Sequence, residues 1–89
     1  MSERIYRLVY SESRTFKKGQ VNVRAWYPDN EGMPALLHVD REYWEDDKDN
    51  PKLTVNSWQH ISNMAIHEMQ RLSILAFDSS IDIFEETKV

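Results

Sequence analysis

The pentapeptide HEMQR at residues 67–71 comes nearest to a catalytic motif in this sequence. It begins like the HExxH helix of zinc peptidases, in which two histidines one turn apart share the metal and the glutamate is the general base. Here Arg71 stands where the second histidine belongs, and its fixed positive charge opposes a dication. On one helix, His60 and His67 would lie about 10.5 Å apart in rise, too far to bind one ion. We therefore expect neither a metal site nor peptidase activity.

Other residue types that perform catalysis or hold cofactors are scarce. The chain has no cysteine, which excludes disulfides, thiolate ligands and cysteine nucleophiles. It has two glycines and therefore no glycine-rich phosphate loop, and no Gly-x-Ser-x-Gly turn occurs. Glu68 would lie at the edge of an apolar helix stripe, where a carboxylate needs a partner, so we expect an ion pair, with a functional site as the alternative. The sequence predicts no catalytic residue and no cofactor, hence a protein that is not an enzyme.

The most distinctive segment is acidic and contains aromatic side chains. Residues 28–51 carry eight acidic and two basic side chains, whereas residues 1–27 carry two acidic and six basic ones. An EF-hand is not expected, because Pro51 stands where that loop needs an oxygen ligand. The pattern favours a docking surface whose aromatic anchors and carboxylates complement a basic groove, although a solvated loop is the plain alternative. The predicted partner-binding residues are Asp40, Glu42, Tyr43, Trp44, Glu45, Asp46, Asp47 and Asp49.

Two alternative surfaces compete with the acidic segment. Basic residues between aromatics on a sheet are typical of single-stranded nucleic-acid platforms, although the net charge of −4 and the lack of an RNP-like run oppose this interpretation. The residues of that platform would be Arg7, Lys17, Lys18, Arg24 and Trp26. A self-associating protein is the third hypothesis, with a homodimer burying Ile66, Ile74 and Phe77, which lie off the main apolar stripe.

Periodicity predicts the elements that position these residues. Alternating apolar and polar residues predict strands over 4–11, 21–27 and 35–40, with 12–20 as a hairpin loop and 52–55 as a short strand or the approach to a helix. An uninterrupted stripe at helical spacing predicts a helix over 57–77 with Asn56 as its N-cap, and 81–85 as a last strand or tail. The stripe comprises Trp58, Ile61, Met64, Ala65, Met69, Leu72, Leu75 and Ala76. We expect one α+β domain over residues 1–89: a small antiparallel sheet of three to five strands packed by one long amphipathic helix.

Size and composition narrow the function class. With 89 residues, no run of ~20 apolar residues and no cysteine, the chain is expected to be a single cytoplasmic domain without a membrane segment. The leading hypothesis is a small acidic inhibitor or adaptor that docks on the basic, nucleic-acid-binding surface of a partner such as a nuclease complex. Phage counter-defence proteins of the anti-CRISPR kind, which act in the host cytoplasm, have this character; the analogy rests on size, charge and lack of motifs, not on matched residues.

Overall fold

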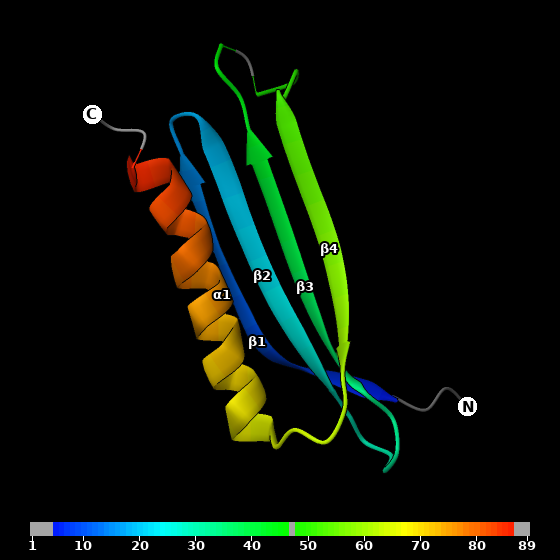
Figure 1. Cartoon of the computed structure of the whole chain (residues 1–89). Helices are drawn as coiled ribbons and strands as arrows, with labels where there is room; N and C mark the ends of the chain where they lie inside the picture. The colour runs from blue at the N-terminus through cyan, green and yellow to red at the C-terminus, as the bar shows by residue number, and fades with distance from the viewer. Residues whose placement is uncertain (1–4, 47, 87–89) are drawn as a thin grey trace.

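The computed structural model describes residues 5–46 and 48–86. It contains four strands followed by a helix: β1 (Tyr6–Phe16), β2 (Gly19–Pro28), β3 (Ala35–Tyr43), β4 (Leu53–Ile61) and α1 (Ile66–Glu86). The strands pair antiparallel in the order β1-β2-β3-β4, so β1 and β4 are the edges of the sheet. α1 lies along one face of this sheet (Figure 1). The predicted fold class is confirmed.

The core lies between α1 and the middle of the sheet. Successive side chains of a strand point to opposite faces, and in β2 and β3 the apolar set of each strand faces the helix. Met69, Phe77 and Phe84 of α1 close the core from the other side. The helix contacts β1, β2 and β3 and stops short of β4. The buried sheet residues are Val21, Val23, Ala25, Ala35 and Leu37.

The predicted helix boundaries are wrong at both ends. Residues 53–61 form β4, so Asn56 is not an N-cap, and the helix begins at Ile66 and continues through 81–85, where a last strand or a tail was predicted. An unbroken apolar pattern cannot by itself separate a strand that runs into a helix from one longer helix. Asn63 lies between the end of β4 and the start of α1. Its left-handed backbone, with a φ of 61°, turns the chain out of the direction of the strand.

Specific contacts hold α1 at its start, in its middle and in its last turns. At the start, the backbone N–H of Ala65 donates to Glu68 Oε1 at 3.2 Å, which is half of a capping box. In the middle of the helix, the hydroxyl of buried Ser73 donates to the Met69 carbonyl at 2.7 Å, and the small side chain lets the helix approach the sheet. Phe84 continues the inward stripe and holds the last turns to the sheet.

In the described residues, no helix combines the length and apolarity needed to cross a membrane.

The first hairpin is longer than the alternation predicted. β1 extends to Phe16 and β2 starts at Gly19, so the predicted loop over 12–20 shrinks to a turn at Lys17 and Lys18. A bulge between Leu8 and Tyr10 shifts the register. Because one extra residue moves the side chains to the other face, Tyr10 lies toward α1 while Leu8 does not.

Gly19 is required where the hairpin meets the end of the helix. A methyl group at this position would overlap the ring of Phe84 and lie 2.5 Å from the Glu42 carbonyl oxygen. Phe84 stacks on Phe16 with the ring centres 4.9 Å apart, so its ring cannot retreat freely.

We predict that Gly19→Ala lowers the free energy of unfolding by ~1–3 kcal/mol, the usual range for overpacking. Urea denaturation followed by circular dichroism measures the change. Thr15→Ala, on the exposed opposite face of the same hairpin, is the control and should cost less than ~0.5 kcal/mol. Equal unfolding midpoints for the two variants would contradict the close approach of Phe84.

Candidate functional site

The sheet face opposite α1 is open to solvent within the described residues, and four rows of neighbouring side chains run across all four strands on it. Directly opposed residues in antiparallel strands share a face, so the register defines each row. Two rows lie nearer the β2–β3 loop, and two lie nearer the β3–β4 loop. The first pair of rows is Leu8, Trp26, Leu36, His60 and then Ser11, Arg24, His38, Trp58; the second pair is Ser13, Asn22, Asp40, Asn56 and then Thr15, Gln20, Glu42, Thr54.

Three rings form an aromatic cluster on this open face: Trp26, His38 and Trp58. The His38 ring stacks on Trp58 with centroids 4.2 Å apart, and the two indoles stack at 5.4 Å. His38 Nε2 lies 2.6 Å from Asn56 Oδ1, a hydrogen bond that fixes the plane of the imidazole. The three rings come from β2, β3 and β4, so the sheet itself holds them in place.

The aromatic cluster is accessible and has aliphatic neighbours. Trp58 is 51% exposed although it is one of the largest apolar side chains in the protein. Leu8 is also half exposed, and half-buried Leu36 lies beside Trp26 in the same row. Exposed aliphatic residues scattered singly are ordinary, but a continuous aromatic and aliphatic patch is typical of a binding surface.

The other end of the open face is acidic. Along β3 the outward side chains run from Leu36 and His38 to Asp40 and Glu42, and the loop beyond adds exposed Glu45, Asp46 and Asp49. Glu45 forms an ion pair with Lys52 at 3.0 Å. Asp47, another predicted docking residue, lies outside the described residues. The face therefore changes from apolar to acidic along the strand direction.

Two residues expected to anchor a partner have internal contacts instead. Trp44 is only 7% exposed, and its indole N–H and backbone N–H donate to the carbonyls of Lys17 and Lys18, both at 2.9 Å. Tyr43 lies on the helix side of β3, with its ring centroid 6.3 Å from that of Phe84. These contacts hold the first hairpin to the end of β3. The large exposed aromatic side chain of the open face is Trp58, which the sequence pattern had assigned to the apolar stripe of a helix.

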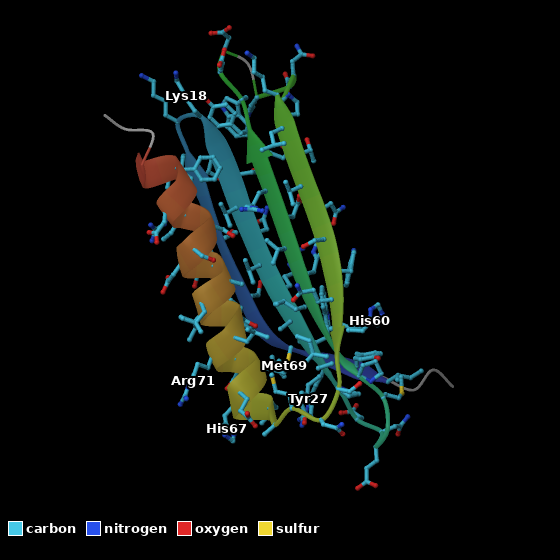
Figure 2. The ribbon with its side chains drawn as sticks, in the orientation of Figure 1. Lys18, Tyr27, His60, His67, Met69 and Arg71 are labelled. Carbon is cyan, nitrogen blue, oxygen red and sulfur yellow. The ribbon has the colours of Figure 1, made fainter. Side chains whose placement is uncertain are left out.

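The predicted nucleic-acid residues do not come together on one face. Arg24 and Trp26 lie in adjacent rows of the open face, as their alternation indicated. Arg7 is opposed to Tyr27, on the helix side of the sheet, and lies 3.6 Å from Asp29. Lys17 and Lys18 form the turn between β1 and β2. Figure 2 shows Lys18 at this tip of the hairpin. On the open face of the described strands, Arg24 is the only arginine or lysine.

The histidines and Glu68 do not form a site either. His60 belongs to β4 and His67 to α1, so they share no helix face, and His67 and Arg71 point away from the sheet (Figure 2). Glu68 caps the helix and has no ion pair among the described residues, contrary to the expected pairing. Across the described ranges, no group of three or more histidine, aspartate or glutamate side chains is arranged to hold a metal ion.

Near the start of α1, the β2–β3 loop and the residues after β4 border an open hollow of about 670 Å³. Tyr27 spans its wall by donating its hydroxyl proton to the Met64 carbonyl at 2.6 Å. Asp29, Glu31 and Glu68 give the hollow an acidic lining. Sequence spacing could not indicate this hollow, because its two walls come together only through the strand pairing.

The predicted apolar dimer face on the helix does not exist as one surface. Phe77 is buried in the core against the sheet, whereas Ile74 is half exposed on the outer side of α1 with Leu75 beside it. The buried face of α1 differs from the predicted apolar stripe, because half of the residues in that stripe precede the helix, which begins at Ile66.

On the helix side of the sheet, burial raises the pKa of the Tyr10 phenol, and the charges of Glu12 and Asp78 raise it further.

One missed signal was available in the sequence. From Leu53 to Ile61 the residues Leu53, Val55 and Ile61 recur at even spacing, as a strand requires, and β-branched residues are frequent.

Comparison with protein-family models, with curated proteins and with solved structures gives no match.

Proposed function

We propose that this chain is a protein-interaction module that docks through the open face of its sheet. The observation that carries the proposal is the aromatic cluster of Trp26, His38 and Trp58, preorganised and accessible on a face that α1 leaves uncovered. Tryptophan is the residue most enriched among the few that dominate binding energy at protein interfaces. Because the strands already fix these rings, little side-chain entropy is lost on binding.

The chemistry of the partner follows from the two ends of this face. An apolar hollow would receive Trp58 and its aliphatic neighbours, while basic residues would face Asp40, Glu42 and Asp46. An interface with an apolar centre and a charged rim is the common arrangement. Basic surfaces are typical of proteins that bind nucleic acid, so a cytoplasmic inhibitor or adaptor acting on a nuclease complex, as anti-CRISPR proteins do, is the concrete form we propose.

Identification of the partner tests this proposal. Tagged wild-type, Trp58→Ala and Leu75→Ala chains are used side by side as baits in lysate of the source cell or its host, and bound proteins are identified by mass spectrometry. Leu75 is the matched control, since it is 59% exposed on the helix side. We expect one protein that the wild type and the Leu75 variant retain and the Trp58 variant loses. A partner retained equally by all three baits contradicts docking through the open face.

Charge reversal at the acidic end should slow association with that partner. Rim charges chiefly steer encounter, so the double change Glu42→Lys and Asp46→Lys is expected to lower the association rate about tenfold with little effect on dissociation. The defect should shrink as salt is raised, because screening removes the steering. Surface plasmon resonance measures both rates. Glu31→Lys together with Asp29→Lys, the same charge change at the other end of the molecule, is the control, and an equal defect in both doubles would contradict the acidic contact.

Single-stranded nucleic acid is the second candidate ligand, favoured by stacked rings next to Arg24 on an open sheet. The carboxylates of Asp40 and Glu42 on the same face oppose it. Tryptophan fluorescence during titration with short oligonucleotides at low and moderate salt separates the two candidates. Salt-sensitive quenching that Trp58→Ala abolishes would favour nucleic acid, and no quenching would leave the protein partner.

A further inference from the structure

The free edge of β4 has the features of a strand that accepts another strand. No other strand in the described part of the chain pairs with this edge, and α1 does not reach it. The nine residues from Leu53 to Ile61 include no aspartate, glutamate, lysine, arginine or proline. Natural proteins normally protect a sheet edge with charges, prolines or bulges, because its unpaired backbone groups accept another strand.

The opposite edge shows the protection that β4 lacks. β1 carries Arg7, Glu12 and Arg14, and its register is broken by the bulge between Leu8 and Tyr10. Bulges and charges prevent regular pairing along an edge. The same chain therefore has one protected and one unprotected edge, which indicates that the β4 edge has an occupant.

We propose that the occupant is β4 of a second copy, paired antiparallel about a two-fold axis beside Ser57. In this register Leu53, which is 57% exposed, opposes Ile61 of the second copy at both ends of the pair. Val55 opposes Gln59, and Ser57 opposes itself. The apolar ends of the strand thus meet each other about the two-fold axis, and each contact occurs twice, as in any two-fold interface. Because β4 has no formal charge, self-pairing brings no like charges together.

Pairing of this kind creates one continuous eight-stranded sheet with both helices on the same face. The two open faces join side by side, so each aromatic cluster gains a copy across the axis. Trp58 then opposes Asn56 of the second copy, beside the His38 to which Asn56 is hydrogen-bonded. This dimer does not depend on the protein partner proposed above, and it would present that partner with two sites.

Single-cysteine variants test the register directly, since the chain has no cysteine of its own. Ser57→Cys chains should cross-link to each other with a short thiol-to-thiol reagent in high yield. Val55→Cys chains alone should not cross-link, because the two thiols would lie ~13 Å apart along the strands, and Gln59→Cys chains alone should likewise not. A mixture of Val55→Cys and Gln59→Cys chains should cross-link between unlike chains. Cross-linking of Val55→Cys alone, or none in the mixture, overturns this register.

Charge swapping at the axis tests the dimer without covalent chemistry. Analytical ultracentrifugation should give the wild type twice the mass of one chain, whereas Ser57→Lys and Ser57→Glu chains should each sediment as monomers because like charges meet. Mixing these two variants should restore the dimer mass. Thermal melts confirm that each variant is folded, and Gln59→Lys, whose charge would face Val55, should weaken the dimer less. A monomeric wild type, or a dimer that Ser57→Lys leaves intact, overturns the proposal.

Discussion

Trp44→Ala is expected to remove a large part of the protein's stability. Truncation of a buried tryptophan costs ~3–5 kcal/mol, whereas a chain of this length has a total stability of ~4–13 kcal/mol. The same change leaves the Lys17 carbonyl without its indole donor and removes the side chain that fills the space beneath the first hairpin. Urea denaturation followed by circular dichroism should show the loss as a much lower midpoint.

Trp44→Phe distinguishes the contribution of this residue to protein stability from any contribution to partner binding. It keeps an aromatic ring but removes the indole N–H, so it should cost only ~1–2 kcal/mol. Under conditions where this variant is folded, its affinity for the partner should equal that of the wild type. If Trp44→Phe were fully stable yet bound the partner much more weakly, Trp44 would be a docking anchor, as the acidic segment of the sequence predicts.

Trp58→Ala is expected to have the opposite profile, with a large loss of binding and a small loss of stability. A central tryptophan in an interface contributes at least ~2 kcal/mol, which corresponds to about a 30-fold weaker Kd. Within the free protein, the change removes the stacking of the indole on His38 and Trp26, worth ~0.5–1.5 kcal/mol per aromatic pair, and the contacts of a side chain that is 51% exposed. Isothermal titration calorimetry with the purified partner measures the first quantity, and thermal unfolding measures the second.

Leu75→Ala is the control for Trp58→Ala, because it removes a similarly exposed apolar side chain from the outer side of α1. It should leave both affinity and stability near the wild-type values. An affinity loss as large as that of Trp58→Ala would move the docking surface from the sheet to the helix. A wild-type Kd for Trp58→Ala would remove the aromatic cluster from the interface.

The sequence by itself determined the fold class and the packing of the central strands. The alternation in Val21, Val23 and Ala25 has a period of two with one buried face, and this pattern specifies the face without knowledge of the neighbours. Alternation likewise placed Arg24 and Trp26 together on the open face. The lack of cysteine excluded disulfides and thiolate sites by composition alone.

Only the tertiary structure decided which aromatic residues are accessible. Trp44 and Trp58 both have polar neighbours in the sequence, yet the first is buried beneath a hairpin turn and the second is exposed on the sheet. That difference depends on strand register and on where α1 lies, and both are set by contacts between residues distant in the chain. The boundary between β4 and α1 was hidden for a related reason, because the apolar pattern continues across it while the left-handed backbone of Asn63 turns the chain.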